Sequence, residues 1–255
     1  MRVGMLEKNG IRDFYALESS RVARRFRGSP FEDASLEDQP TTWLQSELRA
    51  PVRPSKIVCI GRNYAAHAKE MGGNVPAEPL LFLKAPSSLI GHGDTVFLPP
   101  ESARVEHEAE LAVVIGKRVR HIPREQAMSA VFGYTCVCDV TARDLQKTDG
   151  QWSRAKGFDT FCPAGPWIET DLDPSNLNIR CLVDGNVRQD DRTSNMIFDV
   201  PTLIAYVSRA FTLEPGDLIV TGTPEGVGPI VNGNWLTVAI DGIGELTVHV
   251  ANAVH

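Results

Sequence analysis

The sequence predicts a β-rich α+β fold, in which a small N-terminal domain precedes a larger, strand-rich domain. Most recognisable segments of the 255 residues have strand character, and only three are typical of helices. Asn232-Gly233 and Asp241-Gly242 are typical hairpin turns. The segment 50–54, with Pro51 and Pro54, favours an extended connector. We therefore place the small domain at residues 1–54 and the larger domain at residues 55–255.

The expected strands follow from short apolar runs bounded by turn residues. Residues 1 to about 50 are more charged and less periodic than the rest, and no strand is predicted there. The first clear strand is Lys56-Ile57-Val58-Cys59-Ile60, which is apolar, β-branched and followed by Gly61. Further strands are expected at residues 80–84, 111–116, 132–140, 178–183, 217–221, 235–240 and 245–250.

Three helices are expected from periodicity and from the residues that bound them. Tyr64, His67 and Met71 recur at three- and four-residue intervals, and Gly72-Gly73 ends that helix. A second helix is expected over residues 123–131, with a proline in its first turn. A third opens at Pro201, presents an apolar stripe, and stops before residues 215–216.

Composition narrows the class of function. The net charge of −6 argues against nucleic acid or an anionic membrane as the principal partner. No apolar run is long enough to span a bilayer, and the first residues lack the apolar core of a signal peptide. The five cysteines are scattered, which favours buried free thiols and a cytoplasmic protein over a disulfide framework or a zinc site.

The most informative segment is the acidic run at residues 105–111. Side chains alternate along a strand, so Glu106, Glu108 and Glu110 should project to one side. Burying adjacent carboxylates is costly unless a cation or a proton neutralises them, and the run itself contains no Lys or Arg. Two readings stay open at this point: a divalent metal site with oxygen ligands, or a strand end that emerges into solvent.

Other segments carry weaker signals. Asp139 ends an apolar strand, where sites are often built, although it could simply cap a turn while Arg143 pairs with Asp144 on the surface. Lys156 before a glycine would usually be a solvated surface residue. The glycine-rich turn 221–228 could present backbone N–H groups to an anion, but a plain connecting loop is the stronger expectation.

Taken in order, these segments resemble the fumarylacetoacetate hydrolase family. The resemblance spans residues 55 to 250 and implies a mixed β-sandwich roll. It is carried by five motifs: Gly61-Arg62-Asn63-Tyr64-Ala65-Ala66-His67-Ala68-Lys69-Glu70, Glu108-Ala109-Glu110-Leu111, Asp139-Val140-Thr141-Ala142-Arg143-Asp144-Leu145-Gln146, Lys156-Gly157-Phe158-Asp159 and Thr221-Gly222-Thr223-Pro224.

The resemblance also implies roles for individual residues. A Mg²⁺, Mn²⁺ or Ca²⁺ ion would be held by Glu108, Glu110 and Asp139, with Glu106 either supporting this group or on the surface. The implied catalytic residues are His67, Glu70 and Lys156. The implied substrate contacts are Arg62, Tyr64, Arg143, Gln146 and Thr223.

The activity implied is metal-dependent hydrolysis of a C–C bond in a 2,4-dioxo acid such as an acylpyruvate or fumarylpyruvate. Alternatives within the family are decarboxylation of oxaloacetate and isomerisation or decarboxylation of a hydroxyhepta-diene dioate in aromatic degradation. Two alternatives from other classes are a non-catalytic metal-binding domain and a Schiff-base lyase that uses Lys156 as its nucleophile.

The resemblance further implies a homodimer. We expect the N-terminal segment to pack on the main domain or across the dimer, near the mouth of the site. Residues 65–75 are polar and end in glycines, so we expect them to act as a lid over bound substrate.

Overall fold

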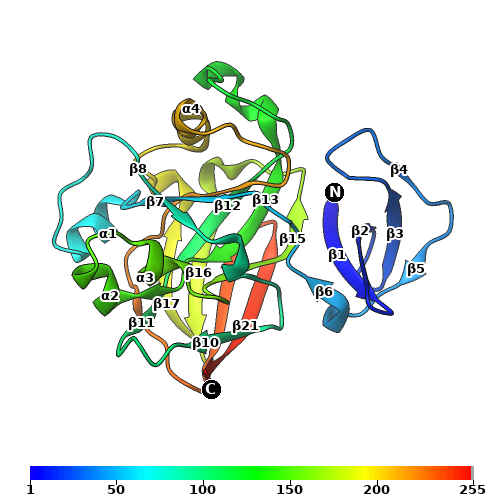
Figure 1. Ribbon diagram of the computed structural model, residues 1–255. Coiled ribbons are helices and arrows are strands. Elements are labelled where there is room, and N and C mark those ends of the chain that lie inside the picture. The colour runs from blue at the N-terminus through cyan, green and yellow to red at the C-terminus, as the bar shows by residue number, and fades with distance from the viewer. Residues whose placement is uncertain (254–255) are drawn as a thin grey trace.

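A computed structural model describes residues 1–253 and places a small N-terminal lobe, formed by strands β1–β6, beside a larger body (Figure 1). No strand was expected before residue 50, but six strands form there. They are β1 (Arg2–Lys8), β2 (Ile11–Leu17), β3 (Val22–Arg27), β4 (Ser35–Leu36), β5 (Thr41–Thr42) and β6 (Leu48–Arg49).

The lobe has its own apolar cluster and is joined to the body through a strand pair. Leu6, Trp43 and Leu48 are buried together within it. Strand β1 pairs antiparallel with β15 of the body, where Arg2 lies opposite Glu169. One continuous sheet therefore spans both predicted domains.

The largest sheet has 13 strands within the described residues, and its main path runs β4-β3-β2-β1-β15-β13-β12-β18-β7-β8. Its strands in the body are β7 (Ile57–Gly61), β8 (Leu80–Lys84), β9 (Leu89–Ile90), β12 (Ala109–Ile115), β13 (Val131–Cys138), β15 (Cys162–Glu169) and β18 (Leu218–Val220).

A second sheet has five strands in the order β10-β21-β20-β16-β17, and a third has three in the order β14-β11-β19. Their bounds are β10 (Thr95–Leu98), β16 (Asn178–Val183), β17 (Asn186–Arg192), β20 (Trp235–Ile240) and β21 (Gly244–Asn252), then β11 (Val105–His107), β14 (Thr141–Ala142) and β19 (Gly228–Pro229).

The main core lies between the large sheet and the five-stranded sheet. Leu111 of β12 and Tyr134 of β13 belong to the same buried cluster as Ile179 of β16, Val238 of β20 and Leu246 of β21. Strands buried on both faces need apolar residues at successive positions, which explains the near-continuous hydrophobic runs in the sequence. The predicted β-rich α+β fold is confirmed.

Four α-helices and five 3₁₀ helices lie outside the sheets in the part of the chain that the structure describes. The α-helices are α1 (Ala65–Glu70), α2 (Arg143–Thr148), α3 (Ser153–Gly157) and α4 (Val200–Ala210), and the 3₁₀ helices are Gln45–Glu47, Pro86–Ser88, Arg124–Ala130, Pro174–Asn176 and Thr193–Asn195. The helix expected at 123–131 is thus a 3₁₀ helix. Helices α2 and α3 and strands β10, β15 and β17 were not predicted.

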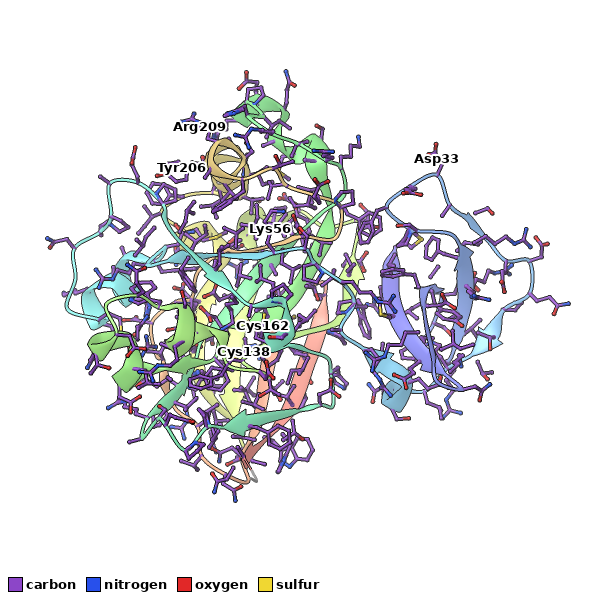
Figure 2. All side chains as sticks on the ribbon, in the orientation of Figure 1. Asp33, Lys56, Cys138, Cys162, Tyr206 and Arg209 are labelled. Atoms are coloured by element: carbon purple, nitrogen blue, oxygen red, sulfur yellow. The ribbon has the colours of Figure 1, made fainter. Side chains whose placement is uncertain are left out.

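Helix α4 shows how local chemistry fixes an element. The side chain of Asp199 accepts from the Thr202 backbone N–H at 3.0 Å and caps the helix. Leu203, Ile204 and Val207 form its buried stripe, as the periodicity predicts. Figure 2 shows Tyr206 and Arg209 on this helix at the margin of the body. None of the helices in residues 1–253 is long and apolar enough to cross a membrane.

The five cysteines are free and buried, as predicted: Cys59, Cys136, Cys138, Cys162 and Cys181. Figure 2 places the labelled Cys138 and Cys162 within the body.

Candidate active site

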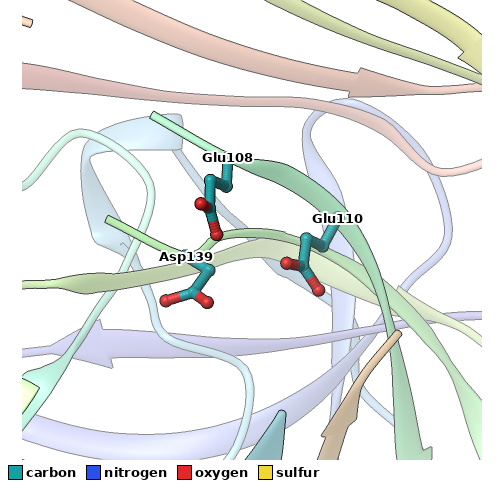
Figure 3. A group of neighbouring side chains, drawn as sticks. All are labelled: Glu108, Glu110 and Asp139. Atoms are coloured by element: carbon teal, nitrogen blue, oxygen red, sulfur yellow. The ribbon is translucent and has the colours of Figure 1, made fainter. Parts of the chain in front are cut away.

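Three carboxylates from neighbouring strand ends point into one space (Figure 3). Glu108 lies between β11 and β12, Glu110 lies in β12, and Asp139 directly follows β13. Strands β12 and β13 pair antiparallel, which brings their ends together. One oxygen from each carboxylate lies within 4.8 Å of the others. All three side chains are buried, so the solvent-exposed strand end considered from the sequence is wrong.

The acidic run itself contains no Lys or Arg, but cationic side chains from outside the run neutralise part of its charge. Lys156 Nζ lies 2.7 Å from both Glu108 Oε2 and Asp139 Oδ2. Lys84 Nζ lies 2.6 Å from Asp139 Oδ1, and Arg143 binds the other oxygen of Glu108. The cations come from distant parts of the chain, which a search inside the acidic run cannot find. Lys156 is consequently buried, not the solvated surface residue that its local sequence suggests.

Glu110 remains the carboxylate without a cationic partner among the ion pairs of residues 1–253. Its Oε2 accepts only from the Gly222 backbone N–H. Burial, followed by the nearby charges of Asp139 and Glu108, raises the pKa of Glu110 well above its ordinary value. A divalent cation held by oxygen ligands would remove this penalty, so the donor set fits a hard metal ion.

Glu106 supports this group from one side. Its Oε2 accepts from Arg143 Nε at 2.6 Å, and its Oε1 accepts from Arg104 Nε at 2.6 Å. Burial alone would raise the pKa of Glu106, but Arg143 and Arg104 hold that pKa below its ordinary value. Because this side chain is buried, Glu106 is not at the surface, and of the two positions considered from the sequence only the supporting one remains. Arg143 therefore links Glu106 to Glu108 instead of pairing with Asp144.

Helix α1 brings His67 and Glu70 together, as their three-residue spacing predicts. His67 Nδ1 lies 3.1 Å from Glu70 Oε2, while Glu70 Oε1 accepts from the Gly226 backbone N–H at 3.0 Å. Gly226 has φ +95°, and a Cβ there would lie 2.3 Å from the Arg188 carbonyl oxygen. The glycine-rich turn therefore presents its N–H groups to protein carboxylates: Gly222 to Glu110 and Gly226 to Glu70.

A cavity of about 240 Å³ joins the carboxylates to the helix. Its lining contains most of the predicted site residues: Glu108, Glu110, His67, Lys156, Arg62, Arg143, Gln146 and Thr223. Asp139 does not line the cavity, but its carboxylate lies beside those of Glu108 and Glu110, which do. Glu70 does not line the cavity either, but it contacts His67, which does. None of residues 1–54 lines the cavity, so within one chain the N-terminal segment does not restrict access as expected.

Tyr64 does not take the place expected for a substrate contact. Its side chain is buried, it is absent from the cavity lining, and its hydroxyl has no hydrogen-bond partner in the described part of the chain. Burial, then the charge of Glu110, raises its pKa. The residue directly precedes α1, and its backbone forms an isolated antiparallel bridge with Met196.

Two residues that sequence reasoning missed hold the site together. Lys84 ends β8, and its charge at the end of an apolar run was the only available signal. Gln189 lies in the polar strand β17 and gave no signal. Its Oε1 accepts from Ala109 N at 2.9 Å, and its Nε2 donates to Thr223 Oγ1 and to the Pro224 carbonyl, each at 2.8 Å. It thereby ties the strand that bears Glu108 and Glu110 to the glycine-rich turn.

Comparison with known proteins gives the same result over most of the chain. Residues 56–251 match the family model for the fumarylacetoacetate (FAA) hydrolase C-terminal domain. The mitochondrial oxaloacetate tautomerase of Arabidopsis thaliana is 47% identical over 206 residues, covering 78% of this chain and 92% of that protein.

Solved structures are similar over the full length. The 2-hydroxyhepta-2,4-diene-1,7-dioate isomerase of Mycobacterium marinum superposes with a TM-score of 0.92 at 41% identity, covering 100% of both chains. The maleylpyruvate hydrolase of Sphingobium sp. SYK-6, solved in complex with manganese(II) and pyruvate, gives 0.80 at 31% identity, again covering 100% of both.

Proposed function

The chain belongs to the fumarylacetoacetate hydrolase family, and from that premise we propose a divalent-metal-dependent enzyme that hydrolyses a C–C bond in a small 2,4-dioxo acid. The observation that carries the proposal is the His67–Glu70 pair, which reaches the same cavity as Glu108 and Glu110. A structural metal site would need no imidazole held by a carboxylate beside it, which argues against the non-catalytic alternative.

Glu108, Glu110 and Asp139 would hold the metal ion. When bound, the ion supplies Lewis acidity toward the carboxylate and keto oxygens of a 2-oxo acid. Three of the four buried carboxylates already pair with four cations, and Glu110 does not: the pairs join Glu106, Glu108 and Asp139 to Lys84, Arg104, Arg143 and Lys156. Adding a divalent ion makes the site positively charged, which favours an anionic substrate whose negative charge increases during reaction.

His67 is the residue in this cavity that can accept a proton from water. Glu70 orients the ring through Nδ1, which leaves Nε2 for a water molecule. That water adds to the carbonyl distal to the 2-oxo acid group, the C–C bond breaks, and its electrons remain on the carbon adjacent to the 2-oxo group. The proton taken by His67 is then available to that carbon, which yields a 2-oxo acid and a second carboxylic acid.

Lys156 acts as a fixed positive charge and not as a nucleophile. Although burial opposes its charge, Asp139 and Glu108 raise the pKa of Lys156 above its ordinary value. A protonated amine cannot attack a carbonyl, so this environment argues against the Schiff-base alternative. Lys156 instead orients two candidate metal ligands and stabilises negative charge at the cavity.

A second candidate is tautomerisation or isomerisation of a 2-oxo acid, which the activities of two of the relatives favour. This reaction needs a proton moved between two positions of the same enol, and His67 can move it without activating water. Oxaloacetate decarboxylation passes through the same enol, but it needs neither an attacking water nor a proton moved between two positions of that enol.

A panel assay with Mg²⁺ or Mn²⁺ separates these reactions. The substrates are an acylpyruvate, fumarylpyruvate, oxaloacetate and a hydroxyhepta-diene dioate. Hydrolysis predicts pyruvate and a second acid in equal amounts from the dioxo acids. Loss of enol absorbance with no cleavage product would instead support the tautomerase or isomerase, and no turnover of any substrate would contradict the enzyme assignment.

A further inference from the structure

We propose that Asn63 is a positioning residue, which fixes His67 relative to Glu110 through the glycine-rich turn 221–228. Asn63 does not line the cavity, and it is not one of the candidate metal ligands. Its role is therefore to position other groups and not to contact the substrate. The inference rests on the proposed function, to which it adds the residue that joins the general base to the candidate metal site.

The first support is the set of hydrogen bonds made by the Asn63 side chain, which is fully buried. Its Nδ2 donates to the Thr221 carbonyl at 2.7 Å and to the Phe198 carbonyl at 3.0 Å. Its Oδ1 accepts from the Phe198 N–H at 2.8 Å. Both amide hydrogens are used, and the reverse orientation would place Oδ1 against two carbonyl oxygens. The side chain therefore has one favourable orientation, in which it joins three separate segments of the chain.

The second support is the length of α1, whose six residues lie at the edge of the body (Figure 1). Isolated helices of this length are not stable in water, so contacts at the two ends must fix its position. Glu70, its last residue, accepts from the Gly226 N–H at 3.0 Å. Asn63 directly precedes the N-cap residue Tyr64 and donates to the Thr221 carbonyl. Both ends of α1 are therefore attached to the same turn.

The third support is the contact between this turn and Glu110. The Gly222 N–H donates to Glu110 Oε2. Gly222 has φ +99°, and a Cβ there would lie 2.6 Å from the Asn63 Cβ. The backbone that binds Glu110 therefore packs directly on Asn63, next to the Thr221 carbonyl that Asn63 binds. Loss of the Asn63 amide would free this backbone to move away from Glu110.

These contacts make the turn a common support for the general base and for one candidate metal ligand. Glu70 holds only the far end of α1, so its loss should loosen the helix and leave the carboxylate group unchanged. Asn63 lies at the point where the helix and the Glu110 contact meet. Its loss should therefore loosen α1 and weaken metal binding together, which a residue that merely stabilises the fold would not do.

The test measures two properties of Asn63→Ala that do not depend on turnover. Hydrogen–deuterium exchange of residues 64–73, measured without metal, reports the stability of α1, whose backbone bonds include Ala68 N–H to the Tyr64 carbonyl. Calorimetry reports the dissociation constant for Mn²⁺. We expect exchange in α1 to be about tenfold faster, the effect of one lost hydrogen bond. We expect Mn²⁺ to bind about tenfold to a hundredfold more weakly, as when a partner of a metal ligand is lost.

A third measurement separates positioning from substrate contact. In the Mn²⁺-saturated protein, Asn63→Ala should lower kcat by about tenfold to a hundredfold, because His67 is no longer held at one place. KM should stay near the wild-type value, because Asn63 does not line the cavity.

Two further variants locate the effect. Asn63→Ser retains one hydroxyl donor and should show the same changes at smaller size, so it replaces Asn63→Ala if that protein does not fold. Glu70→Ala removes the other attachment of α1. It should speed exchange in the helix and leave Mn²⁺ affinity unchanged, because Glu70 contacts none of the three carboxylates.

Ser208→Ala is the matched control for the loss of buried hydrogen bonds. Ser208 lies fully buried in α4 and outside the cavity lining. Its hydroxyl donates to the Ala205 carbonyl at 2.9 Å and accepts from the Ile122 N–H at 3.1 Å, so it also joins two segments. Ser208→Ala should lower stability, with exchange in α1, Mn²⁺ affinity and kcat all as in the wild type.

Two results would overturn the inference. One is a folded Asn63 variant that keeps the wild-type value of either α1 exchange or Mn²⁺ affinity, and the other is a Ser208→Ala protein with losses as large as those of Asn63→Ala. The proposed function is tested separately by wild-type turnover. Both effects in a protein whose wild type cleaves no dioxo acid would contradict the hydrolase alone, whereas wild-type cleavage with neither effect would contradict this inference alone.

Discussion

Lys84 Nζ lies 2.6 Å from Asp139 Oδ1, and both side chains are buried. Lys84 also donates to the Val140 carbonyl at 3.1 Å, so it binds both the Asp139 side chain and the backbone of the next residue. With Lys156 on the other oxygen, the carboxylate of Asp139 is fixed by two lysines from different segments. A candidate metal ligand is thus oriented before any ion binds.

The first prediction concerns this pair. Lys84→Met should lower the free energy of unfolding by about 3 kcal/mol, because it leaves a buried carboxylate with one cation in place of two. Thermal denaturation should show the midpoint reduced by roughly 6–12 °C for a chain of this size. Lys69→Met, at an exposed position of α1, is the control and should shift the midpoint little. A Lys84→Met protein as stable as the wild type would show that the pair does not stabilise the fold.

The second prediction concerns the contact between His67 and Glu70. His67→Gln should lower turnover by about 10²- to 10⁴-fold, the usual contribution of a general base. Glu70→Gln should cost less, since it only weakens the orientation of the ring. Mn²⁺ affinity, measured by calorimetry, should be unchanged in both, because neither residue belongs to the carboxylate group. Full hydrolase activity in His67→Gln would contradict the role of His67.

The third prediction concerns Gln189. Gln189→Met keeps the length of the side chain but leaves the Ala109 N–H and the Pro224 carbonyl without their buried partner. We expect a loss of about 2–3 kcal/mol in unfolding free energy and a lower kcat. Val187→Met introduces the same residue at an exposed position of β17 and serves as the control. Unchanged stability and kcat in Gln189→Met would contradict its positioning role.

Sequence patterns identify the carboxylates of the site better than the side chains that bind those carboxylates. Glu108 and Asp139 were recognisable because each lies where an apolar strand meets polar residues. Lys84 was missed because its approach to Asp139 depends on how strands pair across the sheet, which no local pattern specifies.

Gln189 was missed because it comes from the separate five-stranded sheet. The N-terminal strands escaped prediction for a different reason. In β3, Val22–Arg27, the charged residues Arg24 and Arg25 interrupt the alternation that marks a half-buried strand.

The fourth prediction uses the buried thiols. Burial raises the pKa of all five cysteines, to about 12 for Cys162. Since the thiolate is the reactive form, a disulfide reagent at mildly alkaline pH should not label the native protein on the timescale of minutes. Labelling should reach five thiols per chain in concentrated guanidinium chloride. Fast labelling of any thiol in the native state would show that the site in question opens readily or ionises.

The most direct test of the account is a Mn²⁺ titration of the wild-type protein beside Glu110→Gln, followed by calorimetry. Glu110 is the carboxylate without a cationic partner, so replacing it removes the charge that the ion compensates and should leave the fold intact. We predict one Mn²⁺ per wild-type chain, and an affinity in Glu110→Gln weaker by about a hundredfold or more, with turnover lost in parallel. A Glu110→Gln protein that binds one Mn²⁺ as tightly as the wild type would contradict the metal site.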